Sequence, residues 1–374
     1  MGARVFVGLS GGVDSAVSAA LLKAAGYDVV GVFIKIWRPE FIECTWKEDR
    51  LDALRVCAAL AIPFREIDLS SEYKKNVVDP MLLDYAAGIT PNPDVLCNRA
   101  IKFGAFSAWA RVQGAERIAT GHYARIRQEG AHYQLLRGAD TEKDQSYFLY
   151  RLTQADLART LFPVGDMVKK AVRAKARSLG LPVAEKHDSQ GLCFVGDVSM
   201  PDFLRRYISV VRGNVLDMHG KVIGEHEGAA LYTVGERHGF TVEGSDIAGV
   251  AHYVVRIDTA RNEIVVSSAR ADAQTRSTAL SEVHWIHHAP RDTELAVQAR
   301  YRETPFAARI KHTRHGHVLE SPEPHIFPPG QSLVAYQDDI CLGGGIIRAV
   351  RHASSTDDTL STVQPVEKSV VRVQ

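Results

Sequence analysis

The residues best suited to chemistry form the run Gly8-Leu9-Ser10-Gly11-Gly12-Val13-Asp14-Ser15 near the start of the chain. The run follows the apolar segment 5–7 and precedes a helical pattern over 16–25, so it is predicted to join a strand to a helix. Its central glycines let the backbone approach a phosphate, and its serines and the helix N-terminus add donors and partial positive charge. Its aspartate needs a cation beside a phosphate, which indicates Mg²⁺.

This loop lacks the Gly-Lys-Ser/Thr ending of the common ATPase loop. Its Ser-Gly-Gly-Val-Asp-Ser sequence resembles instead the PP-loop of the ATP pyrophosphatases, which split ATP between its α and β phosphates to activate an oxygen as an adenylate. A Gly/Ser turn before a helix also occurs as a purely structural element. The full motif between a strand and a helix favours the nucleotide-binding interpretation.

Two cysteines lie in contexts that would suit a reactive thiol. Cys97 follows the proline-containing segment 89–94 and lies close to the expected start of a helix, where the dipole and two nearby basic residues would favour the thiolate. Cys193 lies in the polar, Gly-containing segment 188–194. Taken singly, Cys97 is also explained as a buried helix residue. Both thiols beside an ATP-splitting loop suggest sulfur chemistry on an activated substrate.

Length and composition limit the class of protein. A chain of 374 residues is expected to form two or three domains, and 45% hydrophobic with 24% charged residues is typical of globular proteins. No apolar run has the length of a membrane span, and the early first strand leaves no room for a signal peptide, so we expect no membrane partner and a protein that is cytoplasmic or follows an unseen transit peptide. A net charge of +1 means that an RNA partner would need local basic patches.

The five cysteines contain no C-x-x-C pair. This spacing argues against a zinc site and against a disulfide framework, so no resident metal is expected from the cysteines, and the thiols are expected to be reduced. Cys57 is interpreted as a buried structural thiol, and Cys44 lies in a loop.

The hydrophobic pattern predicts an α/β fold: a PP-loop parallel-sheet domain over 1–200, a small central β-rich domain over 201–271 and a C-terminal β-barrel over 272–352. Residues 353–374 are rich in Ser, Thr and Asp and are expected to be disordered. The predicted strands are 5–7, 28–36, 64–68, 117–121, 213–223, 232–234, 252–257, 262–267, 283–287, 294–301, 307–312, 318–319, 331–336 and 340–347. The predicted helices include 16–25, 46–61, 71–85 and 172–179.

Basic and aromatic residues gather in the last of these modules. They are Arg300, Arg302, Arg309, Lys311, Arg314, Tyr301 and Phe306. A barrel face of this composition could hold RNA through phosphates and stacking. A solvated surface explains the same pattern equally well.

Several motifs in order resemble those of the tRNA-specific 2-thiouridylases (MnmA/TrmU family). They are GLSGGVDS, TPNPDVLCN, ATGHYAR, KDQSYFLY, DSQGLCF, YTVGERHG and CLGGGII, and the similarity runs from residue 5 to about residue 350. The resemblance implies that ATP adenylates O2 of the wobble uridine at tRNA position 34, and that a cysteine persulfide displaces AMP to give 2-thiouridine and pyrophosphate. It also implies a PP-loop domain, a small central domain and a β-barrel.

The resemblance assigns roles to individual residues. Gly8 to Ser15, with Ile34 and Gly121, would bind ATP, and Asn92, Pro93 and Asp94 would face the flipped target base. Cys193 would carry the persulfide, and Cys97 would be its partner in a transient disulfide. The tRNA-contacting positions would be His122, Lys143, Asp144, Gln145, Arg300, Tyr301 and Gln331. The implied partners are tRNA and a sulfur-donor protein, and the expected state is a monomer.

Three other functions are compatible with parts of the sequence. A PP-loop amidotransferase or ligase would adenylate a carboxylate and need no cysteine pair. A sulfurtransferase for another tRNA position would often carry a C-x-x-C pair and an iron–sulfur cluster. A nucleotide-sensing RNA-binding protein would bind ATP without forming AMP and pyrophosphate. The sequence also departs from the family at Ser189-Gln190, where Ser-Thr is frequent, and its segment after Cys193 differs in length.

Overall fold

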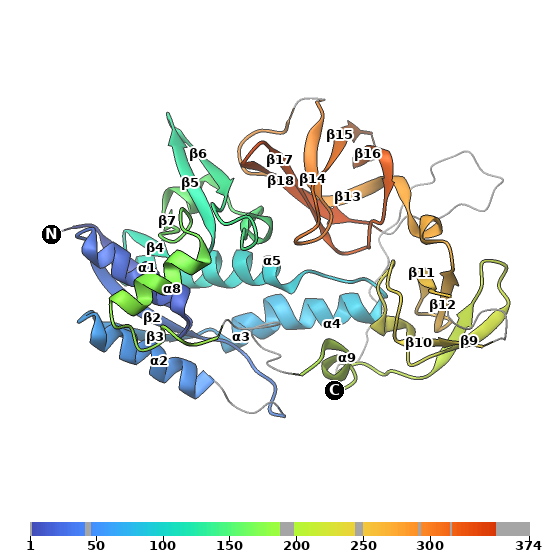
Figure 1. Cartoon of the computed structure of the whole chain (residues 1–374), viewed down its shortest axis with the longest axis horizontal. Coiled ribbons are helices and arrows are strands. Elements are labelled where there is room, and N and C mark those ends of the chain that lie inside the picture. Colours follow the sequence, from blue (N-terminus) through green and yellow to red (C-terminus); the bar gives the residue numbers. More distant parts are fainter. Residues whose placement is uncertain are drawn as a thin grey trace.

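A computed structural model describes residues 2–41, 46–187, 198–243, 250–290, 293–314 and 316–348. Figure 1 shows an α/β part at the N-terminus, a small β part and a β-barrel. The expected persulfide carrier Cys193, the loop residue Cys44 and the predicted disordered tail lie outside the described residues.

The N-terminal part is built on a five-stranded parallel sheet of order β3-β2-β1-β4-β7, which confirms the predicted α/β class. Its strands are β1 (Arg4–Leu9), β2 (Asp28–Lys35), β3 (Phe64–Asp68), β4 (Arg117–Ala119) and β7 (Thr160–Leu161). Chain order runs outward in both directions from β1, so the crevice beyond the carboxyl ends of β1 and β4 is a topological switch point. Ligands of such sheets bind at this position.

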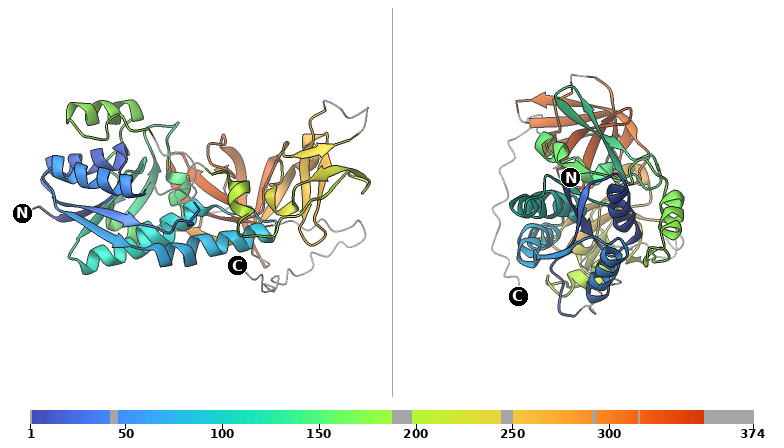
Figure 2. Two further views of the ribbon diagram at one scale, coloured as in Figure 1. Left: turned by 90° about the horizontal axis from the view of Figure 1, so that it is seen from below. Right: turned by 90° about the vertical axis from the view of Figure 1, so that its left-hand side faces the viewer.

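Helices cover both faces of this sheet (Figure 2). The side chains of Val5, Val7 and Leu9 pack with α1 (Val13–Ala24), α2 (Trp46–Ala59) and α8 (Lys169–Ser178). On the opposite face, Phe6, Val30 and Val32 pack with two longer helical segments. Burial on both faces explains why the strands are almost continuously apolar.

Both longer segments contain π-helical turns. The first comprises α3 (Ser70–Tyr73), η1 (Lys74–Val78) and α4 (Asp79–Ala86), and the second comprises α5 (Pro93–Cys97), η2 (Asn98–Phe106) and α6 (Ser107–Val112). Pro80 has no N–H to donate, which explains a break in the α-helical pattern near η1. The sequence predicted the helix over 71–85 but not its π-helical turns.

The central part holds a five-stranded sheet of order β10-β9-β8-β12-β11. Its strands are β8 (Gly213–Leu216), β9 (Val222–His226), β10 (Phe240–Val242), β11 (Tyr253–Asp258) and β12 (Glu263–Ser267), and the short helices nearby are α9 (Met200–Leu204), η4 (Ala229–Leu231) and η5 (Arg270–Ala273). The predicted strand at 232–234 is wrong. Thr233 N–H donates to Glu236 Oε2 at 2.9 Å, and Gly235 has a positive φ of 87°, so this segment turns instead of extending.

The C-terminal part is a six-stranded barrel of β13 (Thr275–Trp285), β14 (Leu295–Gln298), β15 (Phe306–Thr313), β16 (Gly316–His325), β17 (Ser332–Gln337) and β18 (Ile340–Ile347). Pairing of β13 with β18 closes it. β13 and β16 are much longer than predicted from the sequence.

A hairpin from the N-terminal part extends the barrel sheet. It consists of β5 (Ala124–Glu129) and β6 (His132–Arg137), and β6 pairs with β18 at Leu135↔Cys341 and Leu136↔Ile340. The sequence analysis missed this hairpin. The helices η3 (Ser146–Leu149) and α7 (Gln154–Ala158) follow it.

The N-terminal part and the barrel share one hydrophobic core. Leu135 and Tyr336 are fully buried in the same cluster as Phe6, and Tyr147 O–H donates to the carbonyl of Ser332 at 2.7 Å. Burial raises the pKa of the Cys341 thiol, also in this cluster, to about 12. Cys341 is therefore a packing residue. Within the described ranges, no helix is both long and apolar enough to span a membrane.

We expect Leu135→Ala to lower the free energy of unfolding by about 2–5 kcal/mol, because it leaves a cavity in the shared core. Chemical denaturation measures the change. Val112→Ala is the control, since Val112 is 80% exposed and its truncation should change stability by no more than about 0.5 kcal/mol. A Leu135→Ala protein as stable as the control would show that the hairpin does not pack in this core.

Candidate active site

The predicted phosphate loop lies at the switch point of the parallel sheet. It leaves β1 after Leu9, turns through Ser10 to Gly12 and enters α1 at Val13. Gly11 has a φ of 76°, and a Cβ there would lie 2.4 Å from the carbonyl oxygen of Asp49 in α2. The position therefore requires glycine for its conformation and for space.

The loop serines hold the turn together. Ser15 Oγ donates to the carbonyl of Gly12 at 3.2 Å and accepts from Ser10 N–H at 3.3 Å, while the two hydroxyl oxygens lie 3.3 Å apart. Within the described residues, no side chain caps the N-terminus of α1. The first N–H groups of this helix therefore open onto the crevice, as in phosphate-binding sites.

Asp14 joins the loop to two distant parts of the chain. Its carboxylate accepts from Tyr123 O–H at 2.7 Å and from Lys169 Nζ at 2.8 Å to each oxygen. The Lys169 side chain is only 13% exposed, so this ion pair is shielded from solvent more than a surface pair. The pair holds a positive charge beside the loop.

Lys169 and the Tyr123 hydroxyl were not among the residues expected at this site. A signal for Lys169 was present, because α8 begins with two lysines and has no acidic residue in its first turn. A lysine at a helix N-terminus is repelled by the partial positive charge of the helix dipole, which indicates that it is retained there for a functional reason.

The residues expected near the adenosine lie against the loop. A Cβ on Gly8 would lie 3.5 Å from Ile34 Cδ1, and a Cβ on Gly121 would lie 2.7 Å from Ser15 N and 2.8 Å from Asp14 C. Gly121 follows β4 and thus lets the loop and the strand end approach closely. Their roles in ATP binding remain a prediction.

A buried polar group links this crevice to the second longer helix. His122 is 7% exposed; its Nδ1 lies 2.7 Å from Thr120 Oγ1, and its Nε2 lies 3.4 Å from Lys102 Nζ. Burial, together with the nearby charge of Lys102, holds the pKa of His122 well below its usual value. His122 is therefore neutral near pH 7. The structure places it in the interior, so its expected tRNA contact remains a prediction.

Lys102 also acts on the segment expected to face the target base. Asp94 is half-buried, and burial raises the pKa of its carboxyl while the charge of Lys102 opposes the shift. Asn92 is the N-cap of α5, and its Oδ1 accepts from Val95 N–H at 3.3 Å. Pro93 occupies the first turn, where its missing N–H costs nothing.

The predicted nucleophile Cys97 is 5% exposed and ends α5, so it lies a full turn after the start of the helical segment at Pro93. The π-helical segment η2 begins at the next residue. π-Helical turns are frequent at functional sites, where they redirect side chains. Because Cys193 lies outside the described residues, the pairing of these two cysteines remains a prediction.

All three parts of the molecule hold the segment that leads to Asn92. From the barrel, Gln331 Nε2 donates to the carbonyls of Thr90 at 2.9 Å and Pro91 at 3.2 Å. From the central part, Thr233 Oγ1 lies 2.9 Å from Thr90 Oγ1. From the N-terminal part, the Tyr147 hydroxyl lies close to the Asn92 side chain.

Arg300 joins the barrel to the central part. Its Nη2 donates to the carbonyl of Val234 at 2.9 Å, and its backbone N–H donates to Glu303 at 3.1 Å. Tyr301 beside it packs on Phe148, with ring centroids 4.4 Å apart. Arg300 and Gln331 each make an internal hydrogen bond, and the tRNA contacts expected of these two residues and of Tyr301 remain predictions.

The Lys143-Asp144-Gln145 segment is also fixed internally. Asp144 accepts from Gly138 N–H at 2.9 Å and from Arg137 Nη1 at 3.0 Å, and the guanidinium of Arg137 lies 3.5 Å from the ring centroid of Tyr336. Gln145 accepts from Tyr123 N–H at 3.0 Å through its side chain. Lys143 is half-buried. The tRNA contacts of these three residues remain predictions.

Comparisons with known proteins place most of the chain in one family. Family models described as the tRNA methyl transferase HUP domain, the tRNA methyl transferase PRC-barrel domain and the aminomethyltransferase β-barrel domain match residues 3–197, 201–268 and 275–347. The chain is 43% identical over 362 residues to tRNA-specific 2-thiouridylase MnmA of Ralstonia nicotianae, covering 94% of this chain and 98% of the relative. It is 46% identical over 356 residues to the protein of that name from Stenotrophomonas maltophilia, covering 92% and 93%.

Similarity to solved structures is weaker. A 4-thiouridine synthetase–RNA complex with bound ATP is 20% identical and has a TM-score of 0.33, with 55% of this chain and 49% of that chain covered. This degree of similarity carries no weight in the assignment.

The depressed pKa of His122 predicts acid sensitivity. The unfolded chain takes up a proton below its ordinary pKa of about 6.5, whereas the folded chain does so only at lower pH, so stability falls as pH drops below that value. From pH 7.5 to 5.5, His122 alone should account for about 1.4 kcal/mol of lost unfolding free energy. Chemical denaturation at the two pH values should show a smaller loss in His122→Gln. The control His219→Gln, at an exposed turn, should keep the wild-type loss; equal losses in both variants would contradict the prediction.

Proposed function

Because the chain belongs to the family of tRNA-specific 2-thiouridylases, we propose that it uses ATP to replace O2 of the wobble uridine, position 34 of tRNA, with sulfur. The products are 2-thiouridine, AMP and pyrophosphate. The observation that carries the proposal is that Gly121 packs on the phosphate loop, the next residue His122 lies 3.4 Å from Lys102 Nζ, and the charge of Lys102 acts on Asp94. It provides a nucleotide crevice next to a segment that ends in a cysteine.

ATP binds with its phosphates at the Ser10–Ser15 turn and the N-terminus of α1. Lys169, which is fixed by Asp14 at 2.8 Å, adds the positive charge that stabilises the phosphates as pyrophosphate departs. Gly11 lets the turn pass close to α2, and Gly121 lets the end of β4 approach the turn, so that the loop keeps this conformation. Adenine lies beside Ile34 at the end of β2.

Mg²⁺ fits this crevice as a companion of ATP. The Asp14 carboxylate has about four acceptor sites, of which Tyr123 and Lys169 use three. One remaining site suits a metal that binds few protein carboxylates and otherwise phosphates and waters. When bound, the ion neutralises phosphate charge.

The target uracil, flipped out of the anticodon stack, faces Asn92 and Asp94. The raised pKa of Asp94 suits it to accept the N3 proton while O2 attacks the α-phosphorus. The O2–phosphorus bond forms as the bond to pyrophosphate breaks. The resulting adenylate turns O2 into a leaving group.

Sulfur then arrives as a persulfide on Cys193, loaded by a sulfur-donor protein. Its terminal sulfur attacks C2, and AMP leaves with the former O2. The Cys97 thiolate attacks the Cys193 sulfur and releases 2-thiouridine, leaving a Cys97–Cys193 disulfide. A cellular thiol must reduce this bond before the next turnover.

Other reactions are distinguished by their products. A PP-loop ligase would also form AMP, but its activity would be independent of both cysteines. An RNA-binding nucleotide sensor would form no AMP. The family-model descriptions mention methyl transfer, whereas the curated relatives that cover the chain are named for thiolation. Nucleoside mass spectrometry separates these outcomes.

The test incubates unmodified tRNA with the protein, ATP, Mg²⁺ and a persulfide-loaded sulfurtransferase. We expect 2-thiouridine at position 34, with product formation reduced by about 100-fold or more in Cys97→Ser and Cys193→Ser, since each loses a required nucleophile. Cys57→Ser is the matched control, because burial raises the pKa of that thiol to about 11 and keeps it inert. Methylated uridine, or full activity without Cys97 and Cys193, would refute the proposed reaction.

Lys169→Gln tests the ATP step separately. Removing one charge-stabilising donor should lower kcat/KM for AMP formation by about 100-fold. The control is Lys170→Gln, since Lys170 is the exposed neighbour in the same helix. Equal rates for the two variants would exclude Lys169 from the reaction, and an unchanged melting temperature would show that the loss is not caused by unfolding.

A further inference from the structure

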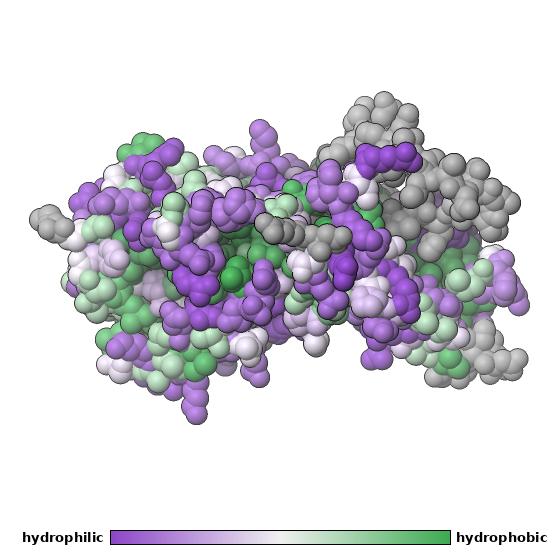
Figure 3. Space-filling model, turned by 90° about the horizontal axis from the view of Figure 1, so that it is seen from above, coloured by the Kyte–Doolittle hydropathy of each residue, from purple (hydrophilic) through white to green (hydrophobic). Residues whose placement is uncertain are grey.

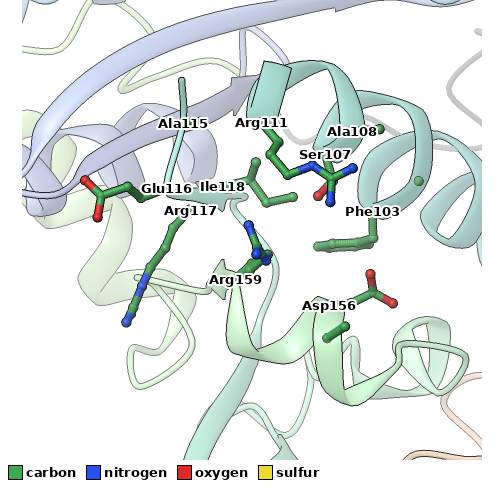
Figure 4. Close-up of a pocket in the computed structure, with 12 residues that line it drawn as sticks. Phe103, Ser107, Ala108, Arg111, Ala115, Glu116, Arg117, Ile118, Asp156 and Arg159 are labelled. Carbon is green, nitrogen blue, oxygen red and sulfur yellow. The ribbon is translucent and has the colours of Figure 1, made fainter. Parts of the chain in front are cut away.

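A second polar hollow lies in the N-terminal part, at the other end of β4. It is a pocket of about 190 Å³ between η2, α6, the start of β4 and α7 (Figure 4). Arg117 opens β4 on this side, whereas Gly121 of the phosphate loop follows the strand's carboxyl end. None of the residues assigned to the reaction lines this pocket.

Three arginines line the pocket: Arg111, Arg117 and Arg159. In the view of Figure 4, Arg111 and Arg159 point toward the hollow beside Phe103 and Ile118, whereas Arg117 and Glu116 extend away from it. Two guanidinium groups from separate elements therefore converge on one space. Guanidinium groups bind phosphate and carboxylate through paired N–H donors.

The carboxylates that line the pocket have other partners. Asp156 Oδ2 accepts from Thr153 N–H at 2.9 Å and from its hydroxyl at 2.7 Å, forming the capping box of α7. Glu116 Oε1 accepts from the backbone N–H of Arg4 at 3.0 Å. In the part of the chain that the structure describes, no ion pair involves the three arginines. Those partners are neutral and leave both carboxylates charged, so the three arginines outnumber the two carboxylates and the lining has a net positive charge.

The floor of the pocket is apolar. Phe103 is 4% exposed and Ile118 is 3% exposed, and both belong to the core beneath. Ala108, Ala115 and Ala155 complete the lining without filling the space. The small part of Phe103 that stays exposed at the base of the hollow can make an edge contact with a planar ring.

We propose that this pocket binds a small aromatic anion, with its ring against Phe103 and its phosphate or carboxylate between Arg111 and Arg159. Figure 3 shows one face of the molecule, on which hydrophilic residues are interspersed with smaller groups of hydrophobic ones. An apolar floor with a few converging polar groups is the common composition of small-ligand sites. The arginines at the rim and Phe103 at the base therefore favour an anion that carries an aromatic ring.

Calorimetric titration with phenyl phosphate, benzoate and inorganic phosphate tests the proposal. The nucleotide crevice is first filled with a non-hydrolysable ATP analogue, so that the probes report on the second pocket. We expect phenyl phosphate or benzoate to bind at least about 10-fold more tightly than inorganic phosphate, because one buried ring adds about 1.4 kcal/mol or more. Weak and equal binding of all three probes would overturn the proposal.

Three variants locate the binding. Arg111→Gln and Arg159→Gln should each weaken the aromatic probe by about 10-fold, since each removes a charge-assisted hydrogen bond. Arg117→Gln, which removes the same charge at a side chain that points away, should change the affinity by less than about twofold. An equal loss in all three would indicate general electrostatic attraction and would refute the pocket. Thiolation without the probe should stay at the wild-type rate in all three variants, so failure of the thiolation reaction would leave this test intact.

Discussion

Residues 89–92 have no regular structure before α5 begins at Pro93, so their conformation depends on contacts from other parts of the chain. Those contacts come from Gln331 of the barrel, Thr233 of the central part and Tyr147 of the N-terminal part. A backbone turn fixed from three sides loses little further conformational entropy when a substrate binds. The three parts of the chain thereby contribute to one site, although the parallel sheet supplies its nucleotide loop.

Asp14 is likewise held by side chains from distant parts of the chain. A carboxylate within a phosphate-binding turn would repel an anion, but Lys169 and Tyr123 satisfy it and place a cation at the crevice. The ion pair thus has two consequences: it fixes α8 against α1, and it makes the local electrostatics suitable for a polyphosphate. Neither consequence depends on the near-zero net charge of the whole chain.

Sequence patterns predicted what local physics determines. The glycines and serines of the Ser10–Ser15 turn and the apolar strands around it follow from residue type and spacing. The start of α5 was expected near Cys97, but the helix begins one turn earlier, at Pro93. The contact between Asp14 and Lys169 joins residues that are far apart in sequence, and no local pattern encodes it. The hairpin β5–β6 was missed because its buried face is completed only by pairing with β18.

The segment at 232–234 illustrates the converse error. Its composition favours a strand, but the hydrogen bond from Thr233 N–H to Glu236 and the positive φ of Gly235 produce a turn. That turn brings the carbonyl of Val234 to Arg300. The strand preference of these residues was overridden because the turn connects the central part to the barrel. A prediction made from one segment alone does not include such a contact.

The pairing of β6 with β18 has a consequence for biosynthesis. A ribosome releases the N-terminus first, yet the buried face of the β5–β6 hairpin, including Leu135, is covered only after the last strand has been made. During synthesis, part of the apolar surface of the N-terminal part therefore stays exposed to solvent. Chaperones bind exposed apolar surface of this kind. Premature termination before β18 would leave that surface permanently exposed.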